Sequence, residues 1–184
     1  MNRDFTFLGG AAGAWRVVTL APVVGASLDP VERLRIVDRR LDALPEGARW
    51  MLRGVTSHER YVTRAEHATL AAKSPPLGRP AATRAAMIPI RKSAEWWGLA
   101  QDERRSILEA RSSHIETGLA YLPAVARRLH HGRDLGEPFD FVTWFEYAPA
   151  DSGAFEELVA RLRRTDEWAY VEREVDIRLA RDGG

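Results

Sequence analysis

Apolar and charged residues alternate near the end of the chain, and this pattern limits the folds that the sequence can adopt. Within residues 171–179, Val175, Ile177 and Leu179 are separated by acidic or basic residues. Successive side chains of a β-strand point to opposite faces of a sheet, so this segment is predicted to be a strand with one face on the core and the other in solvent. The chain must therefore contain a sheet and a layer that covers one side of it.

The sequence upstream of this strand predicts an alternation of strands and helices. In the second part of the chain we expect strand, helix, strand, helix, strand, over residues 84–90, 101–131, 139–147, 155–164 and 171–179. In the first third we expect strand, helix, strand, over residues 15–20, 29–45 and 50–55. Asp29-Pro30 is a helix start signal, and Pro45 is a stop signal.

A linker rich in proline, residues 74–78, follows a short Ala-rich segment that is expected to be helical, residues 63–73. We therefore expect an abbreviated N-terminal unit over residues 1–78 and a larger C-terminal unit over residues 79–184. Helices on one face of an antiparallel sheet, in two β-α-β units, indicate an α+β fold. The predicted architecture is two ferredoxin-like units of the dimeric α+β barrel type.

The composition excludes several classes of function. The 184 residues include 27 Lys+Arg and 26 Asp+Glu, and a net charge of +1 does not favour nucleic acid or a membrane surface as partner. The absence of cysteine excludes disulfides, thiolate zinc sites, iron–sulfur clusters and a cysteine nucleophile. The apolar run from Phe5 to Val24 is interrupted by Arg16 and preceded by Asp4, so we expect neither a membrane span nor a signal peptide, and a cytoplasmic location.

His114 differs in context from the other four histidines. Neighbouring side chains on a helix point about 100° apart, so His130 and His131 cannot chelate one ion, and both are expected at a solvated helix end. His58 and His67 lie among charged residues and are expected at the surface. His114 is expected on a helix face that also carries apolar residues, and spacing alone does not distinguish a ligand there from a structural histidine.

A pair of tryptophans indicates a binding site for a flat ligand. Trp96 and Trp97 are adjacent, and they lie close in sequence to Lys92, one of only two lysines. A simple core accounts for one tryptophan better than for two beside a cation. The pair is therefore a candidate wall for a large planar molecule.

A second candidate element of such a site follows Gly118, where the predicted helix is interrupted. A helix is expected to resume over residues 119–131, with a face of small residues that ends at Arg127. An interruption at Gly118 would let His114 and Arg127 approach one site from opposite sides. The sequence is also consistent with Arg127 as a solvated neighbour of Arg128.

Several motifs within residues 50–180 are together similar to one family. They are Ile88-Pro89-Ile90, Lys92, Trp96-Trp97, His114, the segment 119–122, Arg127 thirteen residues after the histidine, and Thr143-Trp144-Phe145-Glu146. This combination resembles the chlorite dismutase family of haem b proteins. The short chain is similar to the short-chain, dimeric lineage of that family, which implies a homodimer with haem in the C-terminal unit.

The resemblance implies roles on the proximal side of a haem. His114 would be the iron ligand, and Glu167 would accept a hydrogen bond from its other ring nitrogen, with Asp166 as the alternative carboxylate. Trp97 would lie beside the histidine. The residues implied as partners of the haem propionates are Lys92, Trp96, Arg60 and Tyr61.

The resemblance also implies a distal pocket and a reaction. Arg127 matches the single charged distal residue, and Leu122, Thr143 and Phe145 match its uncharged wall. The implied activity is conversion of chlorite to chloride and dioxygen, with formation of an O–O bond through a ferryl species and transient hypochlorite. A guanidinium attracts the chlorite anion, and apolar walls exclude water.

Two other functions of haem proteins remain open. A coproporphyrin-haem decarboxylase of haem synthesis has a related fold but lacks the distal arginine, so Arg127 argues against it. A non-enzymatic haem-binding or sensor protein would bind haem through His114 without releasing oxygen from chlorite. A protein that binds no haem would be an interaction module.

Overall fold

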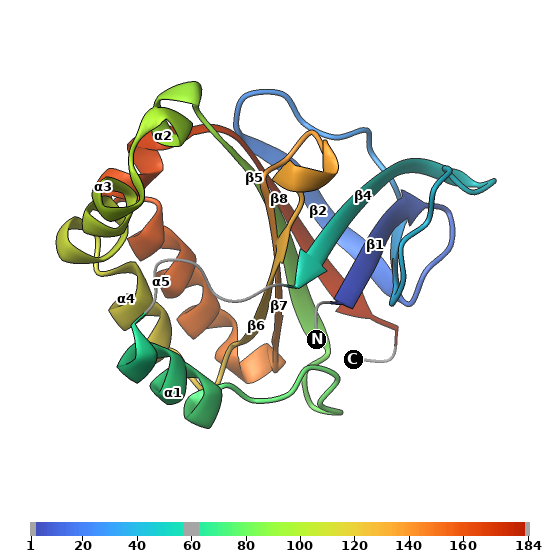
Figure 1. Ribbon diagram of the computed structural model, residues 1–184. Coiled ribbons are helices and arrows are strands. Elements are labelled where there is room, and N and C mark those ends of the chain that lie inside the picture. The colour runs from blue at the N-terminus through green and yellow to red at the C-terminus, as the bar shows by residue number, and fades with distance from the viewer. Residues whose placement is uncertain (1–2, 57–62, 183–184) are drawn as a thin grey trace.

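The strands of the protein close into a barrel, with helices on one side (Figure 1). The computed structural model describes residues 3–56 and 63–182. Its strands are β1 (Arg3–Gly10), β2 (Trp15–Val24), β3 (Arg33–Val37), β4 (Ala48–Thr56), β5 (Arg84–Lys92), β6 (Ala126–His131), β7 (Phe141–Tyr147) and β8 (Val171–Arg181). The predicted α+β class is confirmed, as are the strands expected near residues 15–20, 50–55, 84–90, 139–147 and 171–179.

All pairings between neighbouring strands are antiparallel, in the order β1-β3-β2-β8-β5-β7-β6-β4. Two runs of four strands share one internal order: β4-β1-β3-β2 in the first half of the chain and β8-β5-β7-β6 in the second. The ring closes between β4 and β6, where the described residues have a single pair in register, Val55 opposite His131. Strands from both sides of residue 78 thus belong to one closed sheet, and the proposed division into two units stays a prediction.

The helices cover the half of the barrel that β5 to β8 form (Figure 1). They are α1 (Arg64–Lys73), α2 (Ala94–Gly98), α3 (Gln101–Arg105), a π-helix η1 (Ser106–Arg111), α4 (His114–Ala120), α5 (Ser152–Leu162) and the 3₁₀ turns η2 (Arg133–Leu135), η3 (Pro149–Asp151) and η4 (Asp166–Tyr170). The expected helices near residues 63–73 and 155–164 are confirmed as α1 and α5. In the described part of the chain, no helix is long and apolar enough to cross a membrane.

Two apolar cores hold these layers together. The barrel interior contains large side chains from both halves of the chain, among them Phe7, Leu34 and Trp144. A second core lies between the outer face of the barrel and α5, where Phe145 and Phe155 meet edge to face at 5.2 Å. Strand β5 contributes to both cores, which explains why its sequence is apolar on both faces. The outer face of β6 and β7 is therefore the surface on which the helices build a site.

The helix predicted over residues 29–45 is wrong, because strand β3 occupies part of it. Leu34 is fully buried in the barrel, Ile36 packs against the same core, and the arginines on either side of Leu34 point away from it. The apolar residues of this segment fit both a helical and a two-residue period. Pairing with β1 and β2 selects the second period, since it completes the barrel.

The helix predicted over residues 119–131 is also wrong, because residues 126–131 form strand β6. Pro123 lies between α4 and this strand, and β6 pairs with β7, with Arg127 opposite Phe145. The expected solvated positions of His130 and His131 are wrong for the same reason, since their exposed fractions are 2% and 7%. Burial lowers the pKa of His130 to about 4, and its ring packs against aromatic rings of the barrel core.

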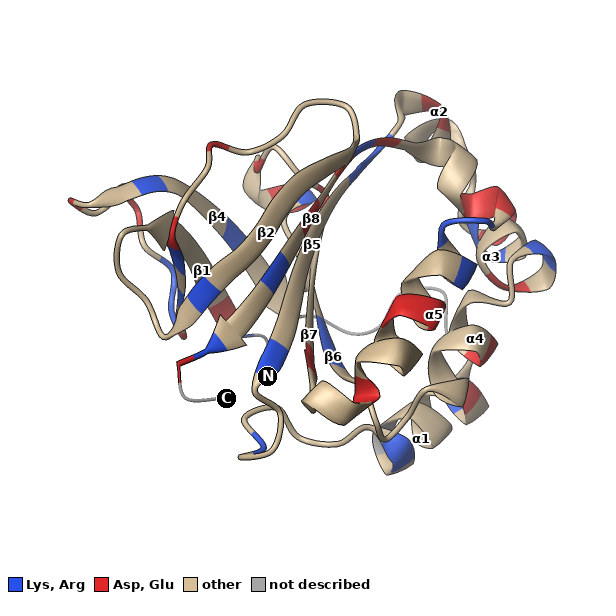
Figure 2. Cartoon of the chain, turned by 180° about the vertical axis from the view of Figure 1, so that it is seen from behind, with Lys and Arg blue, Asp and Glu red and all other residues tan. Residues whose placement is uncertain are grey.

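Charged residues of both signs are interspersed over barrel and helices (Figure 2). On β8 the alternation of apolar and charged residues is present as predicted, with Val175, Ile177 and Leu179 in the barrel core. The expectation that the charged face is solvated holds at Glu172, which is exposed, but is wrong for the middle of the strand. Glu174 is fully buried and Asp176 is 8% exposed, because α5 and η4 cover this face.

Candidate active site

His114 is the first residue of α4, and the backbone before it is unusual. The π-helix η1 ends at Arg111, and Ser113 has a left-handed conformation, with φ 46° and ψ 40°. A residue other than glycine rarely adopts this conformation, which costs on the order of 1 kcal/mol and occurs often at functional sites. The two features turn the chain sharply, so that His114 starts a new helix close to η4.

The start of α4 is fixed by a side chain from the preceding helix. The Glu109 carboxylate accepts a hydrogen bond from the backbone N–H of Ile115 at 2.8 Å and a longer one from Glu116 at 3.4 Å. These groups lie at the helix N-terminus, where backbone N–H groups have no partner within the helix. Glu109 therefore fixes the first turn of α4, which carries His114.

The ring of His114 contacts the buried carboxylate of Glu167 on η4. The distance between His114 Nδ1 and Glu167 Oε2 is 2.6 Å, and Glu167 is 5% exposed. Lys92 Nζ lies 2.8 Å from the other oxygen, Oε1, and 3.2 Å from the Glu167 carbonyl oxygen. The Ser112 hydroxyl accepts a hydrogen bond from the Glu167 backbone N–H at 3.1 Å. Side chains from β5 and α4 thus meet at this carboxylate, and Ser112 holds the backbone of the same residue.

The charge on this carboxylate determines the tautomer of the histidine. Burial raises the pKa of Glu167, but the nearby His114 and Lys92 outweigh that effect and lower it from 4.5 to about 2. The ionised carboxylate only accepts hydrogen bonds, so Nδ1 of His114 carries the proton. When the ring is neutral, the lone pair of Nε2 is then available to a metal, in the arrangement typical of a metal-bound histidine whose second nitrogen has a carboxylate partner.

Asp166, the alternative carboxylate, lies elsewhere. It forms an ion pair with Arg111 at 2.7 Å, in which both side chains are more than half exposed. The structure therefore places Glu167, and not its neighbour, against His114.

Lys92 and Trp96, the expected partners of the haem propionates, are both buried. Lys92 is 4% exposed, and its ammonium group is engaged with Glu167. Trp96 is 1% exposed, and its ring packs against Tyr170 with 5.5 Å between ring centroids. Both belong to the interior that supports Glu167. Lys92 also lines a cavity of about 340 Å³, and the propionate assignment for these two residues stays a prediction.

Trp97 lies on the other side of α2, beside strand β7. Its ring stacks on Phe141 at 6.0 Å, and its indole N–H donates to Asp140 at 3.1 Å. The Arg133 guanidinium lies 3.9 Å from the centre of its ring, and these two residues help to line a cavity of about 340 Å³. These contacts place Trp97 against β7, and its expected place beside His114 stays a prediction. Arg60 and Tyr61 lie outside the described residues.

The residues expected on the distal side come from the outer face of β6 and β7. Arg127 and Thr143 are partly exposed there, and Phe145 is buried against α5. The Arg127 guanidinium packs against α4, where a Cβ added to Gly118 would lie 2.7 Å from its Nη1. Gly118 is four residues after His114, about 6 Å along the helix axis. The fold thus brings Arg127 and the histidine helix together. The expected interruption at Gly118 is wrong, because Gly118 lies within α4 and Arg127 reaches the helix from strand β6.

Apolar side chains complete this region. Leu122 packs on a small cluster that includes Leu108 and Ile115, next to the start of α4. Leu129 lies on the same face of β6 as Arg127, two residues further along the strand, and is 41% exposed. Ligand pockets are lined mainly by apolar side chains, so a partly exposed leucine on the face that the helices cover could contact an apolar ligand. Among the described residues, no group of three or more His, Asp or Glu side chains could hold a bare metal ion.

Comparisons with known proteins point to one family. A family model described as chlorite dismutase matches residues 34–182. The chain belongs to the chlorite dismutase family. A dimeric chlorite dismutase from Nitrobacter winogradskyi has 57% sequence identity and a TM-score of 0.89, with 96% of this chain and 99% of that chain covered.

More distant members of the chlorite dismutase family share the fold. A mutant chlorite dismutase from Candidatus Nitrospira defluvii has 21% identity and a TM-score of 0.69, over 97% of this chain and 90% of that one. The curated chlorite dismutase of Ideonella dechloratans is 37% identical over 84 residues, which are 46% of this chain and 27% of that protein. This match therefore spans about a quarter of the curated relative.

Sequence reasoning missed three parts of the site. Glu109, five residues before the histidine, can be recognised as a cap only if a new helix is known to start at His114. Periodicity does not reveal that start. The left-handed Ser113 and the contact between Lys92 and Glu167 carry no local signal, since the latter joins residues 75 positions apart. A serine pair directly before His114 is the one sequence feature typical of a helix start there.

Proposed function

We propose that this protein is a haem b enzyme that converts chlorite to chloride and dioxygen. The observation that carries the proposal is the hydrogen bond of 2.6 Å between His114 and Glu167, which leaves Nε2 as a ligand next to an apolar face that also bears Arg127. The similarity over nearly the full chain to a dimeric chlorite dismutase supports it.

The residues present fit a haem group. A single histidine with a carboxylate partner suits an iron that has four nitrogen ligands of its own, and the described residues offer no larger set of metal ligands. His114 would bind the iron, and Leu129, Thr143 and Phe145 would lie on the opposite wall. The side chain of His114 is 24% exposed, whereas that of Glu167 is 6% exposed, so the ring is accessible and its partner is not. When bound, haem supplies the redox chemistry that moves an oxygen atom.

The chain itself would bind and retain the anions of this reaction. The Arg127 guanidinium stays protonated at any working pH, so it attracts chlorite and holds transient hypochlorite by charge-assisted hydrogen bonds. Apolar neighbours strengthen that attraction, because they exclude water. Overall the conversion of chlorite to chloride and dioxygen consumes no proton, so no acid or base is needed beside Arg127.

Several finer features belong to the same proposal. The shared strand order of the two halves supports two ferredoxin-like units, of which the N-terminal one has no helix between its strands in the described residues. The haem would lie in the C-terminal unit. The dimeric state of the relative supports a homodimer. Lys92, Trp96, Arg60 and Tyr61 remain candidates for the propionates, and the cytoplasmic location stays a prediction.

The test is a visible spectrum after addition of haemin, followed by an oxygen-electrode trace with chlorite. The parent should show a Soret band and release dioxygen, and His114→Ala should lose both. A parent that binds haemin but releases no dioxygen would be a haem carrier instead. Full retention of a normal five-coordinate ferric spectrum by His114→Ala would overturn the assignment of the ligand.

A further inference from the structure

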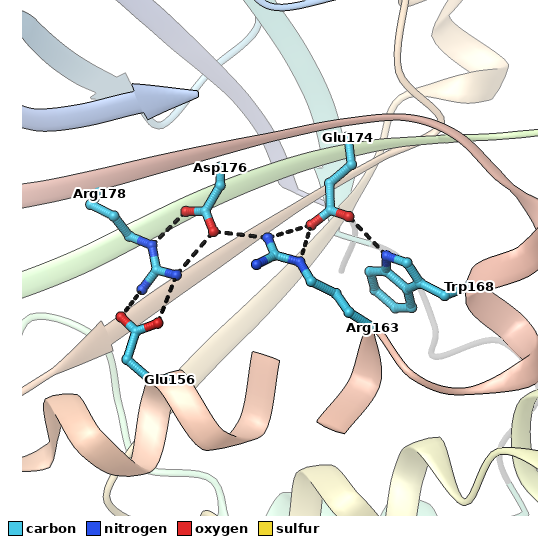
Figure 3. A network of polar contacts seen from close by, with 6 residues as sticks. All are labelled: Glu156, Arg163, Trp168, Glu174, Asp176 and Arg178. Atoms are coloured by element: carbon cyan, nitrogen blue, oxygen red, sulfur yellow. Dashed lines mark hydrogen bonds and ion pairs between the residues drawn. The ribbon is translucent and has the colours of Figure 1, made fainter. Parts of the chain in front are cut away.

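The middle of the charged face of β8, at Glu174 and Asp176, is buried and forms a continuous network with α5 and η4 (Figure 3). Glu174 is fully buried, yet both oxygens of its carboxylate have hydrogen-bond donors. Oε1 accepts from Arg163 Nε and Nη2, at 2.9 and 2.5 Å, and Oε2 accepts from the Trp168 indole N–H at 2.8 Å. The second oxygen of this carboxylate thus holds a residue of η4, the turn that carries Glu167.

The rest of the network ties β8 to α5. Arg163 also reaches Asp176 at 2.8 Å, and Arg178 joins Asp176 to Glu156. Burial lowers the pKa of Arg163, but its hydrogen bonds to two carboxylates raise it above its usual value. The buried carboxylates are thus paired with arginines that stay charged. These ion pairs fix the C-terminal end of α5 against β8.

Trp168 connects this network to the proximal carboxylate. It directly follows Glu167, and its ring centre lies 5.4 Å from the ammonium of Lys92. A cation at this distance over an indole is attracted to the ring. The Trp96 ring lies 4.7 Å from the same ammonium, so Lys92 is placed between two tryptophans while it holds Glu167. Trp168 therefore contacts a buried anion through its N–H and a buried cation through its ring.

Stability alone is a poor reason for this arrangement. Buried ion pairs are often no more stabilising than apolar residues of similar volume, because each charge must be removed from water. A network of fixed bonds does, however, define one position for η4. We propose that Trp168, anchored by Glu174, is a positioning residue that holds Lys92 and Glu167 in place against His114. The inference rests on the proposed function only in that His114 is then an iron ligand.

The experiment follows the Nδ1 proton of His114 in the protein without haem. In ¹⁵N-histidine-labelled protein, His114→Ala identifies the resonance, and its exchange with water is then measured. Trp168→Phe keeps a ring under Lys92 but removes the donor to Glu174, so exchange should become about tenfold faster, the equivalent of one hydrogen bond. Trp168→Leu removes the ring as well and should add roughly a further two- to fivefold.

Two more variants separate positioning from stability. Glu156→Gln breaks the network at its far end, where the Glu156 side chain is 62% exposed, and should leave the exchange within about twofold of the parent. Glu174→Gln keeps an acceptor for the indole but removes the charge, and should accelerate exchange less than Trp168→Phe does. If the Trp168 variants melt at lower temperature while the His114 proton exchanges at the parent rate, Trp168 is only structural and the inference is wrong.

Haemin titration of the same proteins separates this inference from the proposed function. We expect Trp168→Leu to bind haemin about tenfold more weakly than Glu156→Gln, since a loosened Glu167 orients His114 less well. A parent that binds no haemin would overturn the proposed function, and the exchange measurements would still decide the role of Trp168. Equal haemin affinity of all variants, together with equal exchange, would overturn the positioning role.

Discussion

Replacement of Glu167 by glutamine should destabilise the protein in a pH-dependent way, even without haem. Folding lowers the pKa of Glu167 from 4.5 to about 2. Each tenfold change in proton affinity is worth about 1.4 kcal/mol, so the ionised group contributes about 3 kcal/mol to the free energy of unfolding at pH 7. Glu167→Gln removes that contribution and leaves Lys92 buried without its counter-charge.

The sign of the pH dependence follows from the lowered pKa. The contribution is complete above pH 4.5, where the unfolded carboxyl is also ionised, and it is lost as the pH falls toward 2. The difference between parent and Glu167→Gln, measured by urea unfolding, should therefore shrink to about half between pH 5 and pH 3. Asp166→Asn is the matched control and should change the free energy by less than about 1 kcal/mol, because its ion pair is exposed.

Two outcomes would refute this reasoning. Equal destabilisation by Glu167→Gln and Asp166→Asn would show that the buried contact with His114 contributes little. A difference that stays constant from pH 5 to pH 3 would show that Glu167 is not held in its ionised form.

Three other variants test the distal side and the barrel. Arg127→Ala should still release dioxygen from chlorite, about tenfold more slowly, which is one charge-assisted hydrogen bond. It should also leak hypochlorite, so that methionine, added as a scavenger of hypochlorite, prolongs its activity more than that of the parent. Equal protection of both proteins would show that Arg127 only attracts chlorite electrostatically and does not retain hypochlorite. Gly118→Ala should fold but push the Arg127 guanidinium aside, and so lower the oxygen yield toward that of Arg127→Ala. A yield equal to that of the parent would show that the contact between Arg127 and Gly118 does not matter for the reaction. Folding lowers the pKa of His130 from 6.5 to about 4, so protons bind the unfolded chain more tightly and the free energy of unfolding should fall as the pH drops from 6.5 toward 4. His130→Phe should flatten that part of the curve of unfolding free energy against pH. An unchanged slope would assign the pH dependence to another group.

The sequence predicted the strands that have a clear two-residue period and misjudged segments in which two periods coexist. The alternation of Val175, Ile177 and Leu179 identified β8. Leu34 and its apolar neighbours in residues 29–45 fit a helix equally well, and only the closure of the barrel selects a strand. In residues 119–131 the prediction placed Pro123 inside a helix, whereas this proline lies between α4 and β6.

The candidate site depends on contacts that no local pattern encodes. His114 and Glu167 are 53 positions apart, and their pairing was expected only from the resemblance to a family. Alternation shows that Glu174 and Val175 lie on opposite faces of a strand, but it does not show which face a helix will cover. In this protein the barrel takes the apolar face and α5 covers the charged one, so residues expected in water form a buried network.

Among the described residues, the closing junction of the barrel has the fewest residue pairs in register, one, and the junction between β2 and β3 has two. Between β4 and β6 one residue pair is in register, and a side chain supplements it: the Glu137 carboxylate accepts from the Arg53 backbone N–H at 3.0 Å and from its Nε at 2.5 Å. Gly54 lets the strands approach there, since a Cβ at this position would lie 2.6 Å from His130 Cβ. Local unfolding should therefore begin at this junction, and amide hydrogens of β6 should exchange sooner than those of β5 and β8. The ring of strands is therefore most easily opened along β6, the strand that also carries Arg127, the residue proposed to hold the substrate.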